Sequence, residues 1–551
     1  MERPGRAALQ AENPTIFSGR GHPLMREYVV AVDIGTGSAR AGIFDRKGAL
    51  LARADRAIAM NRPEENHAEH DSEDIWAAVC EAVRAAREKA GIGAESVAAI
   101  GFDATCSLVV RDGDGAPLSV NRHGEPRWDT IVWLDHRALA EADFCTATEH
   151  PVLDHSGRVM SPEMEMPKLM WLKRNLPHQW EKAGYFLDLA DYMSWRATGS
   201  AARSRCTLTA KWNYLAHRER GWQQDYLERI GLGDLLTRGG LPEETLPVER
   251  AVGGLTATAA AELGLDTGCR VAPGLIDAYA GALGVLGGFA GDPAKLERQL
   301  ALIAGTSSCI VAFSKEMKPG FGMWGPYFEA VLPGFWLIEG GQSATGALLD
   351  HVVRLHGAGL QPTAETHRKI IERVQELRAE YGDSFADRLH VLPDFHGNRS
   401  PLADPHALGV ISGLALDSSF DALCRLYWRT CVAIALGIRH ILETMREAGY
   451  DLDTLHVTGG HVRNPLLMEL YCDATGCRVV VPQAPDAVLL GTAMAAAVAG
   501  NIYPDLAHAG GAMASTGQER RPDPALRDLY NRDYRRFLAL YRHRAELESI
   551  E

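Results

Sequence analysis

Two short turns rich in glycine, threonine and serine carry the clearest chemical signal in the sequence. The first occupies residues 33–38 (DIGTGS) and the second residues 305–308 (GTSS), each between apolar runs that predict β-strands. Successive backbone N–H groups in such a turn form a concave anion site, to which hydroxyls add donors. One such turn alone is more often an ordinary hairpin, but two matched copies predict a pair of phosphate-binding loops. The residues assigned to phosphate binding are Gly35, Thr36, Gly37, Ser38, Gly305, Thr306, Ser307 and Ser308.

Two aspartates stand where phosphate chemistry would need carboxylates. Asp33 begins the first turn, and it can hold Mg²⁺ through water, because magnesium favours carboxylate oxygens and retained waters. Asp277 follows an apolar run in the segment PGLIDAYAG, between the two turns. An aspartate can deprotonate a hydroxyl in line with a phosphoryl group. An aspartate at a strand-to-helix turn is also a common helix cap, so local sequence leaves both roles open for Asp277.

A short motif occurs twice, once in each half of the chain, and forms an internal echo. Pro273 is followed four residues later by Asp277, and Pro482 is followed four residues later by Asp486. A glycine follows in the next turn or two of each segment. Together with the paired Gly-Thr turns, this echo predicts two related α/β halves. Asp486 is then expected to be the copy of the motif that caps a helix.

Domain boundaries follow from the places where breaker residues gather. Gly, Asp and Pro cluster at residues 287–293, which predicts domains at 25–290 and 291–551. Residues 1–24 lack the apolar core of a signal peptide and are expected to be a flexible N-terminal extension.

Periodic segments between these landmarks predict the elements that hold the turns. A helix is expected to begin at Ser72 as its cap and to run through Ile75, Trp76 and Val79. Apolar runs at 97–102 and 454–458 predict strands. Further helices are expected at 167–174, 363–381, 420–448 and 523–547.

Composition excludes several classes of protein. The 551 residues carry 71 acidic against 57 basic side chains, a net charge of −14, which argues against nucleic acid as a partner. No apolar stretch is long enough to span a bilayer, so no membrane association is expected. The ten cysteines are scattered without zinc-type spacing, which favours a reducing, cytoplasmic location.

Several blocks of the sequence resemble the FGGY carbohydrate kinases. VAVDIGTGSARAGIFD and LIAGTSSCIVAF are similar to the phosphate loops of that family, and IVWLDHRA is similar to its W-x-D-x-R turn. GGQSATGALLDH, GNRSP and VTGGHVRNPLL resemble three later blocks, in the family's order. Lys168 and Trp171 match the K-x-x-W core of another pattern, whereas Glu163 and Glu165 depart from its usual small or aromatic residues.

The resemblance implies a fold and a chemistry. The fold would be α/β, the two-domain actin-like ATPase (ribonuclease H-like) type, with the active site in the interdomain cleft. The cofactors would be ATP and Mg²⁺, and Asp277 would be the catalytic base rather than a cap. Gly459, Gly460 and Asn464 resemble the adenosine loop and are assigned to ATP binding.

The resemblance also points to a small-molecule sugar as substrate. Lys211 and Glu339 resemble the sugar-contacting pair of the L-ribulokinases, and Trp133 belongs to the W-x-D-x-R block. Thr105 and Cys106 open the run TCSLV, which looks like the D-ribulokinase subgroup. D-Ribulose is therefore the expected substrate.

Other readings stay open on the sequence alone. A kinase for L-ribulose, xylulose, glycerol or another polyol would carry most of the same blocks. From a different class, an actin-like or Hsp70-like ATPase switch would explain the phosphate turns, but not the W-x-D-x-R, K-x-x-W and GGQSATG blocks. The sequence leaves a homodimer as an open alternative.

Overall fold

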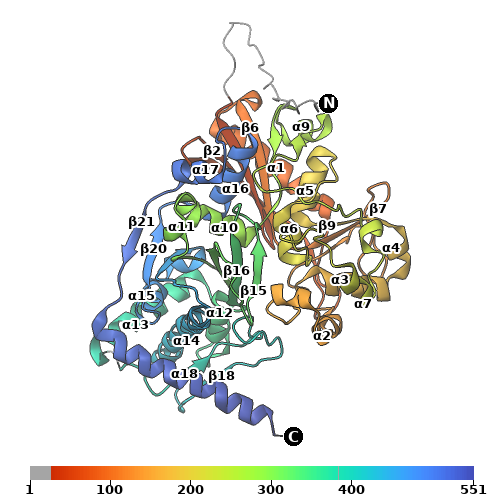
Figure 1. Ribbon diagram of the computed structural model, residues 1–551. Helices are drawn as coiled ribbons and strands as arrows, with labels where there is room; N and C mark the ends of the chain where they lie inside the picture. The colour runs from red at the N-terminus through yellow and green to blue at the C-terminus, as the bar shows by residue number, and fades with distance from the viewer. Residues whose placement is uncertain (1–25, 383, 551) are drawn as a thin grey trace, which may run out of the picture.

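The computed structural model describes residues 26–382 and 384–550. The extension predicted at 1–24 lies outside the described residues. Figure 1 shows two groups of strands and helices, one formed mainly by the first half of the chain and one mainly by the second.

The first half carries two sheets and most of the short helices. Its strands are β1 (Tyr28–Ile34), β2 (Ser38–Phe44), β3 (Leu50–Ala57), β4 (Met60–Asn61), β5 (Glu69–His70), β6 (Val97–Ala104), β7 (Leu108–Asp112), β8 (Thr130–Ile131), β9 (Ala183–Asp188), β10 (Gly253–Gly254), β11 (Arg270–Val271) and β12 (Leu275–Ile276). Its helices are α1 (Ser72–Ala90), α2 (Leu139–Ala147), α3 (Glu165–Asn175), α4 (Pro177–Lys182), α5 (Leu189–Thr198), α6 (Arg205–Lys211), α7 (Gln224–Arg229), α8 (Leu235–Arg238), α9 (Ala257–Leu263) and α10 (Asp277–Leu286).

The second half carries longer helices. Its strands are β13 (Gln299–Ala304), β14 (Ser308–Ser314), β15 (Trp324–Phe328), β16 (Trp336–Gln342), β17 (His390–Leu392), β18 (Val410–Ser412), β19 (Thr454–Thr458), β20 (Arg478–Pro482) and β21 (Gly517–Arg520). Its helices are α11 (Pro293–Leu296), α12 (Gly346–Leu355), α13 (Ala364–Tyr381), α14 (Phe420–Glu447), α15 (Pro465–Asp473), α16 (Ala487–Ala499), α17 (Leu506–Met513) and α18 (Arg527–Glu548).

The two large sheets share one local arrangement. In the first, strands run in the order β10-β11-β6-β1-β2-β3, with β12 also beside β6, and in the second β15-β16-β14-β13-β19-β20-β21. β1 and β2 form an antiparallel hairpin with β6 parallel to β1. β13 and β14 form the matching hairpin, with β19 parallel to β13. The internal echo of the sequence thus corresponds to a repeated strand arrangement, with a Gly-Thr turn at the tip of each hairpin.

Two crossing helices, α10 and α16, join the halves (Figure 1). α10 follows β12 of the first sheet and packs on β13, while α16 comes late in the chain and packs on β1 and β6. Glycines permit the crossing, because a Cβ added at Gly284 would lie 1.9 Å from the carbonyl oxygen of Ala487. A Cβ at Gly491 would lie 1.8 Å from the carbonyl oxygen of Ala280. The backbones therefore approach more closely than any side chain would allow.

The helices predicted by periodicity are present, with shifted ends. The segments predicted at 363–381 and 420–448 are α13 and α14, and the last helix, α18, begins at Arg527 rather than at 523. The cap predicted at Ser72 is wrong. Asp71 is the N-cap of α1 and accepts from two backbone N–H groups, whereas the Ser72 hydroxyl donates to the carboxylate of Asp129 at 2.7 Å.

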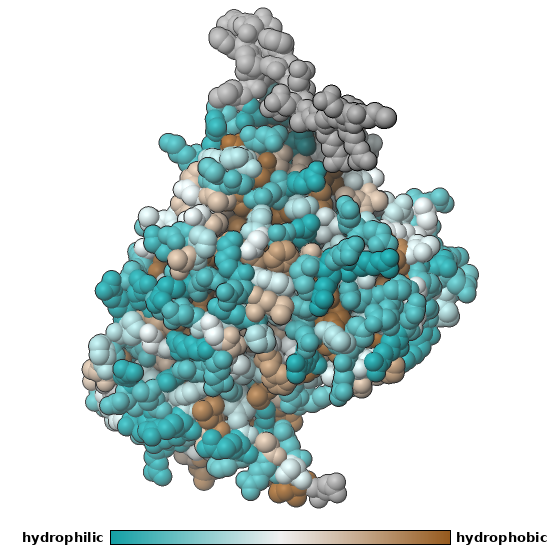
Figure 2. Space-filling view, in the orientation of Figure 1, coloured by the Kyte–Doolittle hydropathy of each residue, from teal (hydrophilic) through white to brown (hydrophobic). Residues whose placement is uncertain are grey.

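The surface is mostly polar on the face in Figure 2, where hydrophobic residues appear only in small separate groups. The apolar residues instead fill cores under the two large sheets and around α10 and α16. Among the described residues, none of the helices combines the length and the hydropathy needed to cross a membrane.

Candidate active site

A cavity of about 410 Å³ is lined by residues from both halves of the chain. Most of the residues singled out in the sequence lie on its wall: Asp33, Gly35, Thr36, Thr105, Cys106, Trp133, Lys211, Asp277, Gly305, Thr306, Ser307, Glu339, Gly459 and Gly460. The residues assigned to phosphate, sugar and base roles therefore meet in one space, although they are scattered over more than four hundred positions.

The Gly-Thr turns close the two hairpins at this cavity. In the first, the N–H of Gly35 donates to the carbonyl oxygen of Ser38 at 3.0 Å, and in the second the N–H of Gly305 donates to that of Ser307 at 2.8 Å. Gly459, after β19, has a φ of +91°, and a Cβ there would lie 2.4 Å from the carbonyl oxygen of Ala304. Glycine is thus required at position 459 for this loop to approach the end of β13, just before the second turn.

Asp33 lies at the end of β1, beside the first turn, and is buried. Its carboxylate accepts from Nη1 of Arg40 at 2.7 Å. Burial raises the pKa of Asp33 to about 7, an effect that the Arg40 guanidinium opposes and the nearby Asp277 carboxylate reinforces. The Asp277 carboxylate is thus close enough to raise the pKa of Asp33, and a cation would stabilise the charge of such a buried carboxylate.

Asp277 is the first residue of α10, directly after β12. Its carboxylate accepts from the N–H of Ala278 at 2.7 Å, and it is not the cap of its helix, because Ile276 occupies that position. Burial raises the pKa of Asp277 above its ordinary value, which moves a carboxylate toward the range suited to a general base. In the echo, Asp486 does cap α16, accepting from the N–H of Leu489 at 3.2 Å, as predicted.

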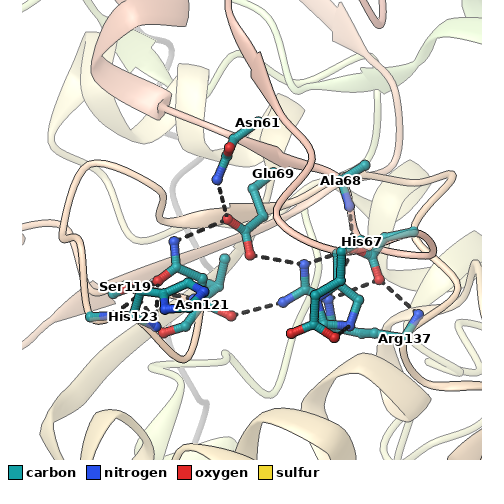
Figure 3. Close-up of polar contacts among 12 residues, drawn as sticks. Asn61, His67, Ala68, Glu69, Ser119, Asn121, His123 and Arg137 are labelled. Atoms are coloured by element: carbon teal, nitrogen blue, oxygen red, sulfur yellow. Dashed lines mark hydrogen bonds and ion pairs between the residues drawn. The ribbon is translucent and has the colours of Figure 1, made fainter.

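The W-x-D-x-R turn fixes Trp133 against the first phosphate turn. The indole Nε1 of Trp133 donates to Oγ1 of Thr36 at 3.0 Å. Four residues along the chain, the buried side chain of Arg137 pairs with Asp135 at 2.7 Å. It also pairs with Glu69 at 3.0 Å, a contact that can be followed in Figure 3. A buried arginine that shares two carboxylates is strongly held, so this network positions the tryptophan.

Lys211 and Glu339 form a buried ion pair that joins the halves. Nζ of Lys211, at the end of α6, lies 3.1 Å from Oε2 of Glu339 in β16. Tyr279 donates to the same oxygen at 2.7 Å, and the lysine lies 4.1 Å from the ring centroid of Trp324. Burial opposes both charges, but each partner outweighs it: the pKa of Lys211 is raised and the pKa of Glu339 is lowered. Both groups are thus charged at neutral pH.

Thr105 and Cys106 directly follow β6 and line the same cavity. The hydroxyls of Thr105 and Ser107 are 3.2 Å apart. Burial raises the pKa of the Cys106 thiol to about 12. A neutral thiol is a poor nucleophile, so Cys106 contributes shape to the cavity rather than covalent chemistry.

Four of the assigned residues do not line the cavity. Gly37 is exposed at the tip of the first turn and Ser38 begins β2. The hydroxyl of Ser308 lies 2.9 Å from that of Thr345, and Asn464 caps α15. Their roles in ATP binding stay predictions.

Sequence reasoning assigned no role to several side chains of the cavity wall, among them Arg40, Trp324 and Arg399. Arg40 lies inside the first quoted block and Arg399 inside GNRSP, so the blocks located both residues without indicating what they face. Nothing in the local sequence marks Trp324, because its place depends on the pairing of β15 with β16.

Comparison with known proteins identifies the family to which the chain belongs. Residues 28–284 match the N-terminal domain of the FGGY family of carbohydrate kinases, and residues 300–500 match its C-terminal domain. The chain therefore belongs to the FGGY family of carbohydrate kinases.

The chain is also similar to individual proteins and solved structures. An FGGY carbohydrate kinase domain-containing protein of Danio rerio is 44% identical over 542 residues, covering 95% of this chain and 99% of that protein. A D-ribulokinase of Saccharomyces cerevisiae is 36% identical over 524 residues, covering 87% of this chain and 72% of its own. A xylulose kinase structure from Rhodospirillum rubrum has a TM-score of 0.78 at 24% identity, covering 94% and 99% of the two chains. The predicted actin-like, two-domain α/β fold is confirmed.

Proposed function

We propose that this carbohydrate kinase transfers the γ-phosphoryl group of ATP to the 5-hydroxyl of D-ribulose, giving D-ribulose 5-phosphate. The observation that carries the proposal is the single cavity in which Asp277 shares a wall with both the Gly-Thr turns and the Lys211–Glu339 pair. The TCSLV run and the similarity to a protein named D-ribulokinase support the D-ribulose assignment.

In this proposal Asp277 accepts the proton of the 5-hydroxyl as its oxygen attacks the γ-phosphorus, and ADP leaves with the electrons of the broken P–O bond. Lys211 donates to hydroxyl or carbonyl oxygens of the sugar, and Glu339 accepts from its hydroxyls. The 5-hydroxyl is the primary alcohol farthest from the ketone, so it can face the base while the other hydroxyls are held elsewhere.

The backbone and side-chain groups around the two turns suit a nucleotide with bound magnesium. Backbone N–H groups of the two hairpin tips suit phosphate oxygens, and the carboxylates of Asp33 and Asp277, which line the same cavity, suit a hydrated divalent cation. Asp33 would hold the cation through water, with ATP along Gly305–Ser307 and the Gly459–Gly460 loop. When bound, Mg²⁺ neutralises charge on the phosphates.

A substrate screen tests the proposed sugar. ADP release is measured with ketopentoses, ketohexoses, pentitols and glycerol, and D-ribulose is expected to give the highest kcat/KM. A site that hydrogen-bonds a hydroxyl discriminates strongly against the isomer that leaves its groups unpaired. A higher kcat/KM for L-ribulose, D-xylulose or another polyol would assign one of the alternative substrates. ATPase activity that does not respond to any sugar would favour the nucleotide-switch alternative.

Removal of the Asp33 carboxylate is expected to impair use of the cation. In Asp33→Ala, the Mg²⁺ concentration that gives half the maximal rate should rise by about 10- to 100-fold, as for other residues that hold a metal through its outer shell. The KM for the sugar should change little. Asp55→Ala, which removes an exposed carboxylate of β3 outside the cavity, is the control. Superimposable Mg²⁺ titrations of Asp33→Ala and wild type would refute the assignment.

A further inference from the structure

A second ion pair joins the halves at the cavity. Nη2 of Arg399, in the second half, lies 3.2 Å from both carboxylate oxygens of Glu163, in the first. Like Lys211 and Glu339, both residues line the cavity. The pairs have opposite polarity, since the first half supplies the lysine of one and the glutamate of the other. Two ion pairs thus connect the halves around one space, and the proposed mechanism uses only one of them.

The surroundings of Arg399 hold its side chain in place. Its guanidinium lies 5.0 Å from the ring centroid of Trp324, and Nη1 donates to Sγ of Cys309 at 3.5 Å. The loop that carries it is braced as well, because Asn398 donates to Asp394 at 3.0 Å. Arg544 of α18 also donates to Asp394, at 2.7 Å. Such support is typical of a residue that must present its donors in a fixed direction.

One donor of Arg399 has no acceptor within the part of the chain that the structure describes. The side chain is 6% exposed, yet Nε has no hydrogen-bond partner among the described residues. A buried N–H without an acceptor is costly, and a guanidinium can only donate. A guanidinium has five N–H donors, and Glu163 and Cys309 take at most three of those of Arg399. A sugar in the cavity would bring hydroxyl and carbonyl oxygens to the part of the guanidinium that lines it.

The position of the Arg399–Glu163 pair determines where in the cavity a sugar would contact it. Arg399, Glu163 and Trp324 also line a smaller cavity of about 60 Å³ beside the first. The pair therefore forms part of the boundary between the two spaces. A ligand that fills the larger cavity up to this boundary contacts the guanidinium.

We propose that Arg399 is a sugar-binding residue contributed by the second half of the chain, and that Glu163 is its positioning residue. The sugar would then be bound from both halves, by Lys211 from one and by Arg399 from the other. Glu163 is one of the two acidic residues that depart from the K-x-x-W pattern, and the pair with Arg399 gives that departure a reason. The inference rests on the proposed function only in that the ligand of this cavity is a sugar.

Steady-state kinetics of three variants test the proposal, with whichever sugar of the screen the wild type phosphorylates fastest. Failure of D-ribulose as substrate therefore leaves the test intact. Arg399→Met should raise the sugar KM by about 10- to 100-fold, the usual effect of losing a hydrogen bond from a charged donor, with little change in the ATP KM. Arg399→Lys keeps a charge for Glu163 but not the guanidinium fork, so it should recover only part of the affinity. Glu163→Gln should give a smaller rise in the same direction.

Arg205→Met provides the matched control. Arg205 forms an ion pair with Glu329, which also joins the two halves, but neither residue lines the cavity. Loss of a mere connection between the halves would affect Arg205→Met and Arg399→Met alike. An unchanged sugar KM in Arg399→Met overturns the proposal. So does an equal rise in Arg205→Met, a matching rise in the ATP KM, or full recovery in Arg399→Lys.

Discussion

Replacing Asp277 by asparagine is expected to lower kcat by about 10²–10⁴-fold, the usual cost of a lost general base. Asparagine has nearly the same shape and can still accept from the N–H of Ala278, so the start of α10 should be undisturbed. Sugar and ATP binding should therefore stay close to wild type in calorimetry. The loss would lie in the chemical step, which rapid-quench measurement of a single turnover isolates.

The echo of the motif supplies the control for this variant. Asp486 occupies the matching place before α16, where it caps the helix and pairs with Arg53. Asparagine is as good a cap as aspartate, so Asp486→Asn should retain nearly normal turnover. Comparable single-turnover rates in Asp277→Asn and wild type would remove Asp277 from the proton transfer.

The sequence predicted the parts of the site that depend on local structure. A Gly-Thr turn between two apolar runs forms its hairpin through contacts a few residues apart, so the strands on either side of Gly35 and Gly305 could be read directly. The long helices α13 and α14 were likewise predicted from their periodicity. Ser72 shows the limit even here, because a distant carboxylate, Asp129, competes for its hydroxyl.

The rest of the site depends on contacts between distant segments. The Arg399–Glu163 pair joins residues 236 positions apart, and the Lys211–Glu339 pair joins residues 128 positions apart. No local pattern indicates such partners. The family resemblance supplied Lys211 and Glu339, whose block had a known role, but it gave no role to Arg399. Charge, burial and an unused donor identify that residue only after the halves are placed together.

The buried Lys211–Glu339 pair should affect stability as well as activity. Both side chains are at most 3% exposed, so removal of one partner leaves a charge in a poorly solvated site. Lys211→Met is expected to destabilise the protein by about 3–5 kcal/mol, the usual cost of breaking a buried ion pair. The double variant Lys211→Met/Glu339→Gln removes the stranded charge and should recover much of that loss. Arg399 keeps its own partner, Glu163, in both variants.

Thermal unfolding with and without sugar separates the two roles of the pair. The midpoint should be lowest for Lys211→Met and intermediate for the double variant, and neither should gain stability from sugar or turn it over. In Lys211→Met the pKa of Glu339 should rise, because burial is then opposed by the charge of Arg399 but no longer by that of Lys211. A raised pKa in the folded state means that stability is highest at low pH and is lost as pH rises through that pKa. The loss of stability of Lys211→Met relative to wild type should therefore be smaller at pH 5 than at pH 8. An equal loss of stability at both pH values, or a double variant less stable than the single one, would show that Glu339 is not held as a buried charge by Lys211.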